Sequence, residues 1–144
     1  MEIRTGLRLS QSEVLNLLER FDDSSDSPLH VGLDFMTYSL KLSQYAYFVI
    51  AYNGTEQIGF MAYYLNDENH FVYVPQIVVH KDTRHKGVGH LMFQHLYETL
   101  TTEYWSIDLE VLKSNDNARA FYRREGFVEY EDRNERFLLK KNIC

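Results

Sequence analysis

The sequence has little cysteine or proline and no long apolar run, and each scarcity excludes a class of protein. Its single cysteine, Cys144, is the last of 144 residues, so no internal disulfide and no cysteine-rich metal cage can form. With only two prolines, the composition argues against a disordered or fibrous chain. The best apolar run, residues 71–79, is much shorter than the ~18 apolar residues of a membrane helix.

Basic residues are also fewer than acidic ones. The chain has 15 Lys and Arg against 21 Asp and Glu, which gives a net charge of −6. Because such a chain is repelled by phosphate backbones, we expect no nucleic-acid partner and no membrane partner. Residues 1–9 alternate charged and apolar side chains and lack the apolar core of a secretion signal. These features predict a cytoplasmic, soluble protein; its oligomeric state is left open, with a homodimer as one candidate.

What the chain does contain is enough apolar material for a core. Hydrophobic residues make up 44% of the sequence and aromatic residues 15%, beside 25% charged residues. The length falls within the ~100–200 residues of one domain. We therefore expect a single domain over residues 1–144.

The first half of the sequence has clear helix and strand signals. Residues 2–9 alternate as a short strand does, and Ser10 and Glu13 have the spacing of a capping box, in which each caps the other's backbone N–H. The helix that starts there has an apolar face of Val14, Leu17, Leu18 and Phe21. The polar residues 22–28 predict a mobile loop, and a weaker helix should follow over 34–43, on the pattern of Phe35, Tyr38, Leu40 and Leu42.

The second half continues this mixed pattern. Residues 45–52 and 57–65 predict a hairpin around Asn53-Gly54, followed by a turn at 66–69 and a strand over 70–80. A helix over 87–102, a strand over 105–112 and a helix over 115–124 follow, with Gly126 as a left-handed stop and a final hairpin of 127–131 and 135–140. The order β α α β β β α β α β β excludes an all-α bundle and a β-sandwich, and indicates a layered α/β or α+β domain.

The segment from Arg84 to His90 is a candidate phosphate-binding turn. It lies between a strand and an amphipathic helix, and Gly87 and Gly89 would let the backbone approach a ligand at the positive end of the helix. It is neither a Walker A loop nor a dinucleotide fingerprint, because no Lys-Ser/Thr follows and Met92 stands where a third small residue belongs. Taken alone, the Gly-x-Gly pattern could also be an ordinary helix start.

Two segments together resemble one family. Residues 77–89, which end in Arg84-His85-Lys86-Gly87-Val88-Gly89, resemble the acetyl-CoA motif of the GNAT superfamily, the Gcn5-related N-acetyltransferases. Residues 115–127 resemble its second signature, with Asn115 seven residues before Tyr122 and then Gly126-Phe127. Both signatures occur in the family order, and the predicted elements match the family topology along nearly the whole chain.

The resemblance implies a fold and a co-substrate. The fold would be a central mixed, mostly antiparallel sheet with two splayed parallel strands, 70–80 and 105–112, and flanking helices. Acetyl-CoA would lie along these strands, and no metal is implied. Its binding residues would be Ile77, Val78, Val79, Arg84, His85, Lys86, Gly87, Val88, Gly89, His90 and Asn115. Asn115 is also a good helix N-cap without any ligand. The arginines at 119, 123 and 124 either meet the 3′-phosphate of CoA or line an exposed helix face.

The resemblance also implies catalytic residues. Tyr122 matches the family tyrosine that sits near the thioester sulfur, where a phenol can donate a proton, although it could simply pack beside Phe121. Glu110 resembles the glutamate that acts as base in members that acetylate protein N-termini. It could instead be a solvated or ion-paired carboxylate of a strand. Tyr73, Gln76 and His80 are the other polar candidates on the preceding strand; His80 could act as the base or merely end that strand.

The predicted function is therefore transfer of an acetyl group from acetyl-CoA to a primary amine in a direct ternary complex. The acceptor would be a small molecule or a peptide, and the acidic segments 22–28 and 66–69 mildly favour a cationic one. Two alternatives remain: a non-catalytic acyl-CoA-binding module with the same fold, and an anion site for another nucleotide.

Overall fold

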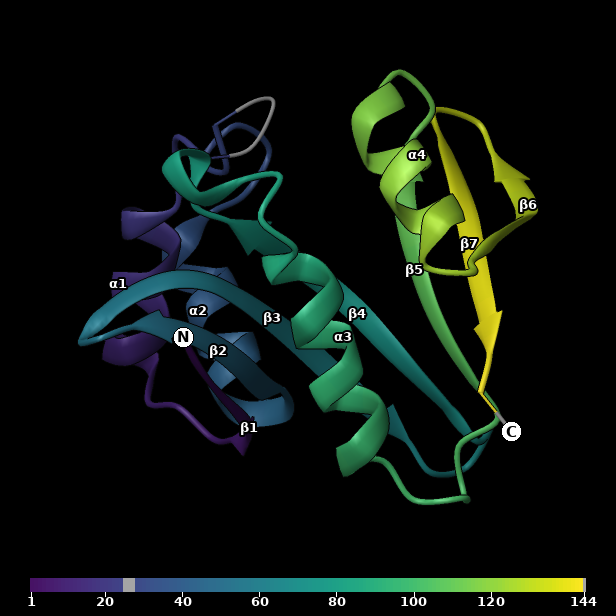
Figure 1. The fold of residues 1–144 in the computed structure, drawn as a ribbon, viewed down its shortest axis with the longest axis horizontal. Coiled ribbons are helices and arrows are strands. Elements are labelled where there is room, and N and C mark those ends of the chain that lie inside the picture. The colour runs from purple at the N-terminus through teal and green to yellow at the C-terminus, as the bar shows by residue number, and fades with distance from the viewer. Residues whose placement is uncertain (25–27, 144) are drawn as a thin grey trace. The chain divides into compact units, whose positions relative to one another are not determined.

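A computed structural model describes residues 1–24 and 28–143, and its elements follow the predicted order (Figure 1). The one addition is a short 3-10 turn, Lys81–Thr83, after the fourth strand. The mixed α/β prediction is confirmed. The helices are α1 Gln11–Arg20, α2 Phe35–Tyr45, α3 Val88–Thr99 and α4 Asp116–Arg124. The strands are β1 Glu2–Leu7, β2 Tyr47–Asn53, β3 Glu56–Asn66, β4 Phe71–Val79, β5 Ser106–Leu112, β6 Val128–Arg133 and β7 Arg136–Asn142.

The strands form a mixed sheet in the order β1-β2-β3-β4-β5-β7-β6. Its contacts divide the chain into two compact units. Unit 1 consists of Met1–Tyr64 and Gln76–Thr99, and unit 2 consists of Leu65–Pro75 and the described residues from Leu100 onward. Strand β4 runs from one unit into the other. That residues 1–144 form a single domain stays a prediction.

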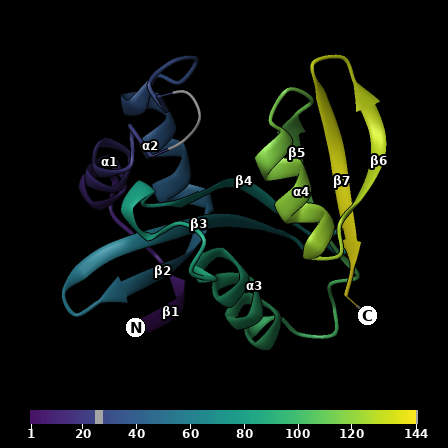
Figure 2. The same ribbon diagram turned by 45° about the horizontal axis from the view of Figure 1, so that its top comes forward.

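Unit 1 is a layer of strands with helices on both faces. Helices α1 and α2 cover one face of β2 and β3, and α3 lies on the other (Figure 2). The predicted face of α1 is confirmed, because all four of its residues are buried. They form the centre of a core that also takes in side chains from α2, β2, β3 and β4; its largest members are Leu17, Leu18, Phe21, Leu42, Phe48, Ile50 and Phe60.

The capping box at the start of α1 is confirmed. The Glu13 N–H donates to Oγ of Ser10 at 3.2 Å, and the Ser10 N–H donates to Oε1 of Glu13 at 2.9 Å. Hydrogen bonding of the Glu13 carboxylate to Ser10, first to its backbone N–H and next to its side chain, holds the pKa of Glu13 below its usual range. The cap therefore satisfies two backbone donors that the helix itself cannot pair.

We predict that Ser10→Ala lowers the free energy of unfolding by about 1 kcal/mol, because the N-cap acceptor is lost. Turnover of the folded variant should not change. Urea unfolding measures the first effect, and Ser12→Ala in the same helical turn is the control, with an expected change within about 0.5 kcal/mol. A large loss of turnover in a variant of unchanged stability would mean instead that α1 orders the acceptor site directly.

Three details of unit 1 differ from the predicted ones. Helix α2 begins later than 34, because Asp34 is its N-cap and accepts from the Met36 N–H at 3.1 Å. Its buried face includes Ser39, whereas Leu40 is exposed. The hairpin turn consists of Gly54-Thr55 rather than Asn53-Gly54, since Asn53 still pairs in the ladder and Gly54 takes the positive φ. Part of the predicted mobile loop, residues 25–27, lies outside the described residues.

Helix α3 is shorter than predicted. It ends at Thr99, and its buried side includes Phe93 while Thr99 is exposed. The Thr99 hydroxyl donates to the hydroxyl of Thr5 on β1 at 2.9 Å. The last turn of the helix is therefore held to the first strand by a polar contact.

Unit 2 combines a parallel and an antiparallel pairing. The first residues of β4 run parallel to β5, with Phe71 opposite Ser106 and Tyr73 opposite Asp108. Strand β7 pairs antiparallel with both β5 and β6, and α4 lies along β5 and β7 (Figures 1 and 2). The core side of this sheet carries Ile107, Leu109 and Val111, all buried. Since strand side chains alternate, Asp108 and Glu110 lie on the opposite face.

Candidate active site

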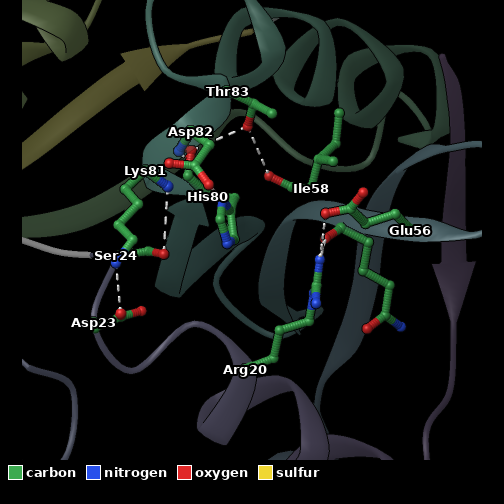
Figure 3. A network of polar contacts seen from close by, with 10 residues as sticks. Arg20, Asp23, Ser24, Glu56, Ile58, His80, Lys81, Asp82 and Thr83 are labelled. Carbon is green, nitrogen blue, oxygen red and sulfur yellow. Dashed lines mark hydrogen bonds and ion pairs between the residues drawn. The ribbon is translucent and has the colours of Figure 1, made fainter.

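In unit 1, a network of polar contacts fixes the turn that follows β4 (Figure 3). Lys81 Nζ pairs with Asp23 at 2.7 Å, and the Lys81 N–H donates to the hydroxyl of Ser24 at 3.4 Å. Nδ1 of His80 accepts from the Asp82 N–H at 3.2 Å, and the His80 ring lies edge-on to Phe21. His80 therefore has a structural role at the end of the strand, which leaves its Nδ1 already bonded.

The candidate phosphate-binding turn has the backbone geometry that its glycines suggested. His85 and Gly87 both have positive φ, at 64° and 80°. The Gly87 carbonyl accepts the first helical bond of α3, from the Leu91 N–H at 3.0 Å, so the amides of Val88 and Gly89 precede the hydrogen-bonded part of the helix. Apart from the two chain neighbours of Gly87, no described residue has an atom within 4 Å of a Cβ placed on it. The turn thus presents an open stretch of backbone donors at the positive end of a helix, which suits a phosphate.

A glycine that the sequence reasoning missed sets the position of this helix. A Cβ on Gly59 of β3 would lie 3.2 Å from Val88 and 3.3 Å from Met92, both on α3. The first turn of α3 can therefore pack closely against β3 only because residue 59 has no side chain. The only signal in the sequence was a glycine within a predicted strand, which is typical of a place where another element packs closely against the strand backbone.

The positive charge at and beside the turn is smaller than the number of its basic residues suggests. Lys81 is paired with Asp23, so its charge is compensated. Arg84 and Lys86 are exposed and form no ion pair within residues 1–24 and 28–143. Of the strand residues predicted to contact acetyl-CoA, Val78 turns its side chain into the core of unit 1, so it could offer only backbone groups there. Ile77 and Val79 point to the other face of β4 and are half-buried.

In unit 2, Asn115 is the N-cap of α4. Its Oδ1 accepts from the Ala118 N–H at 3.1 Å. Arg119 pairs with Glu129 of β6 at 2.8 Å, donates to the Lys113 carbonyl at 3.0 Å and lies over the Phe137 ring. Arg119 is therefore used to hold α4 against the strands, rather than standing free on an exposed helix face.

The end of α4 explains the Tyr-to-Gly-Phe spacing in physical terms. Gly126 has φ 98°; its N–H donates to the Arg123 carbonyl at 3.1 Å, and the Phe127 N–H donates to the Tyr122 carbonyl at 2.9 Å. These are the two hydrogen bonds of a Schellman motif. The hydrophobic contact of that motif is also present, with the rings of Tyr122 and Phe127 5.7 Å apart. The helix stop therefore also fixes the Tyr122 ring.

The phenol of Tyr122 is buried. Burial raises its pKa, so the group stays protonated well past neutral pH and remains a proton donor. Within the part of the chain that the structure describes, its hydroxyl makes no hydrogen bond to another residue. The ring is thus packed while the hydroxyl is left for another partner.

Glu110 projects from β5 beside two groups from other strands. Oε1 of Glu110 accepts from the Tyr73 hydroxyl at 3.2 Å, and Oε2 lies 3.8 Å from Arg133 of β6. Burial first, and the neighbouring Glu110 carboxylate next, raise the pKa of Tyr73 to about 12. The sequence indicated Glu110 and Tyr73 separately, but their contact and the contact with Arg133 come only from the register of the sheet.

Two further features are absent from the described residues. No group of three or more His, Asp or Glu residues gathers as metal ligands would in residues 1–24 and 28–143. Across the same residues, each helix is too short or too polar to pass through a bilayer.

Several solved structures share this fold. Among solved structures, the PaiA N-acetyltransferase of Thermoplasma acidophilum, in complex with coenzyme A, has a TM-score of 0.78 at 16% identity, with 99% of each chain covered. The ribosomal-protein-S18-alanine N-acetyltransferase of Escherichia coli has a TM-score of 0.76 at 17% identity, over 99% of this chain and 94% of that one. An aminoglycoside 6′-N-acetyltransferase complexed with coenzyme A reaches 0.77 at 13% identity, over 100% and 98%.

At these identities the structures show a shared fold. No curated protein matches the sequence significantly. The model of the acetyltransferase (GNAT) family matches residues 12–127, which include both signature segments. Because that match spans most of the sequence, the chain belongs to the GNAT family of acetyltransferases.

Proposed function

We propose that residues 1–144 act as one acetyl-CoA-dependent N-acetyltransferase domain that transfers the acetyl group directly to a primary amine. The observation that carries this proposal is the Tyr122 hydroxyl, which is kept protonated by burial and has no partner within residues 1–24 and 28–143. A side chain needed only for packing would not require that hydroxyl. This favours the enzyme over the non-catalytic acyl-CoA-binding module.

The turn in unit 1 would hold the pyrophosphate of acetyl-CoA. Positive φ at His85 and Gly87 and the open space over Gly87 fit a close approach of phosphate oxygens to the backbone. Arg84 and Lys86, both exposed, would add positive charge. The remaining proposed contacts are backbone groups of Ile77, Val78, Val79, Val88, Gly89 and His90, and the side chain of Asn115.

The residues of unit 2 would move the protons. The acceptor ammonium gives one proton to Glu110, and the freed nitrogen lone pair forms a bond to the thioester carbonyl carbon while the carbonyl π pair moves to oxygen. That pair re-forms the carbonyl as the carbon–sulfur bond breaks with its electron pair on sulfur, which takes the phenolic proton of Tyr122. The nitrogen loses its second surplus proton to water, and solvent restores both Tyr122 and Glu110. No covalent enzyme intermediate is required.

The acceptor class proposed is a cationic small-molecule or peptide amine. The net charge of −6 would attract such a molecule. The solved structures that share the fold are named for a ribosomal-protein alanine and for an aminoglycoside, so the same fold serves both kinds of amine.

A screen of amine acceptors tests the proposal. Polyamines, amino sugars, aminoglycosides and peptides with free N-termini would each be incubated with acetyl-CoA, with release of the CoA thiol as the readout. We expect at least one amine to raise release above background hydrolysis, and its N-blocked form to have no effect. Double-reciprocal plots that intersect would support the ternary complex, whereas parallel lines would indicate a covalent intermediate. Tight binding of acetyl-CoA without transfer to any amine would favour the non-catalytic module.

A further inference from the structure

The two oxygens of the Glu110 carboxylate have different partners, and these come from different strands. Oε1 accepts the hydroxyl proton of Tyr73 on β4 at 3.2 Å, which is a hydrogen bond. Oε2 faces the guanidinium of Arg133 on β6 at 3.8 Å, which is an ion-pair distance but longer than a hydrogen bond. Oε1 is therefore engaged, while Oε2 keeps lone pairs for a further proton donor.

The backbone explains why these groups meet. Tyr73 is opposite Asp108 in the parallel pair of β4 and β5, and Glu110 is two residues further along β5. Since side chains alternate along a strand, residues 73, 108 and 110 lie on the same face of the sheet. That face is the one opposite the buried Ile107 and Leu109. The contact is thus fixed by sheet register rather than by a flexible loop.

We propose that Tyr73 is a positioning residue for proton transfer: its hydroxyl holds Oε1 of Glu110, so that Oε2 is the oxygen that takes the proton of the acceptor ammonium. This inference rests on the proposed function and on Glu110 as its base. Tyr73 does not replace Glu110 in that role, because a phenol so hard to ionise remains a donor at neutral pH. Its function is to orient the carboxylate.

Loss of the Tyr73 hydroxyl should release Oε1 of Glu110, because the hydrogen bond that it accepts from Tyr73 is removed. We expect the carbon-13 resonance of the Glu110 carboxyl to shift in Tyr73→Phe, since the chemical shift of a carboxylate responds to the loss of a hydrogen-bond donor. The other charged groups near the pair stay in place in this variant: Asp108 on β5, Glu131 and Arg133 on β6, and Arg136 and Lys140 on β7.

Carbon-13 NMR of the glutamate side-chain carboxyls at neutral pH measures this resonance without any acceptor, with Glu110→Gln as the assignment. Tyr130→Phe is the matched control, because Tyr130 is an exposed tyrosine of β6 whose ring lies near Lys140, and its hydroxyl is not bonded to Glu110. The resonance should shift in Tyr73→Phe and stay in Tyr130→Phe. An unchanged resonance in folded Tyr73→Phe overturns the proposal.

A double-mutant cycle supplies the kinetic test. Tyr73→Phe alone should lower kcat about tenfold, as expected for a misplaced base. In the Glu110→Gln background the same change should alter kcat by less than about twofold, since a positioning residue acts only through its partner. Equal losses in both backgrounds overturn the proposal. If Glu110→Gln slows turnover but Tyr73→Phe does not, only this inference fails; if Glu110→Gln has no effect, the proposed base fails as well.

Discussion

Replacing Tyr122 with Phe should lower kcat about 10²- to 10⁴-fold with a good acceptor, the range expected when one general acid is removed. Affinity for acetyl-CoA should remain nearly unchanged, because the phenolic proton is needed only as the sulfur departs. The raised pKa of Tyr122 supports this assignment, since the acid form persists as pH rises through the ordinary range of tyrosine. Steady-state kinetics and calorimetry with acetyl-CoA measure the two effects separately.

The variant should fold as well as the parent. Phe keeps the ring that packs on Phe121 and Phe127, and no described residue loses a hydrogen bond when the hydroxyl is removed. Tyr52→Phe in β2 is a suitable control, because it deletes a hydroxyl in unit 1 while Arg4 still lies over the ring. If turnover of Tyr122→Phe stayed within about twofold of the parent, far below that general-acid range, Tyr122 would be a packing residue and the sulfur would leave without an acid.

The second large effect is expected at the phosphate turn. Gly87→Glu should weaken acetyl-CoA binding at least about 100-fold, because a carboxylate beside the pyrophosphate brings like charges together at a cost of several kcal/mol. The side chain would also fill the open space over Gly87. Isothermal titration calorimetry with acetyl-CoA measures the loss, and circular dichroism checks that the variant is folded.

Gly87→Ala separates the charge effect from backbone strain. Its φ of 80° is unfavourable for any residue with a Cβ, at about 1–2 kcal/mol, but the Cβ itself meets no atom within 4 Å. Ala should therefore reduce stability and weaken binding much less than Glu. Equal affinity of Gly87→Glu and the parent, in folded protein, would place the pyrophosphate elsewhere.

Local chemistry made much of this structure predictable from the sequence. The Ser10 cap, the Asn115 cap and the Gly126 stop each depend on residues within a few positions of one another. Such motifs satisfy backbone groups at helix ends in the same way in any fold, so spacing alone identifies them. The order of helices and strands follows from these helix caps and stops together with the periodicity of apolar residues.

Contacts between distant segments could not be predicted in this way. The pairing of Tyr73 with Glu110 depends on the register of two parallel strands whose paired residues are 35 positions apart (Phe71 and Ser106). The pairing of Lys81 with Asp23 depends on where the chain turns after α1, and it compensates a positive charge close to the phosphate turn. A sequence pattern shows which face a side chain lies on, but not which residue of another strand it meets.

Helix α2 shows a different limit of prediction from the sequence. Its sequence suggested an apolar side with Leu40, yet Leu40 is exposed and Ser39 is buried, with its hydroxyl bonded to the Met36 carbonyl at 3.1 Å. A serine can be buried in a helix when it returns its hydroxyl to the preceding turn, which costs little. A hydrophobicity pattern does not detect this, because it counts serine as polar wherever it lies.

Strand β7 is synthesised after β5 and β6, yet it lies between them and is hydrogen-bonded to both. While the chain is being made, β5 emerges with Glu110 before its antiparallel partner exists. Domains tend to fold as units in the order in which they are synthesised. Unit 2 therefore stays incomplete until residues 136–142 have been added, and its proposed proton-transfer groups, although made earlier, would be held in place only from then on.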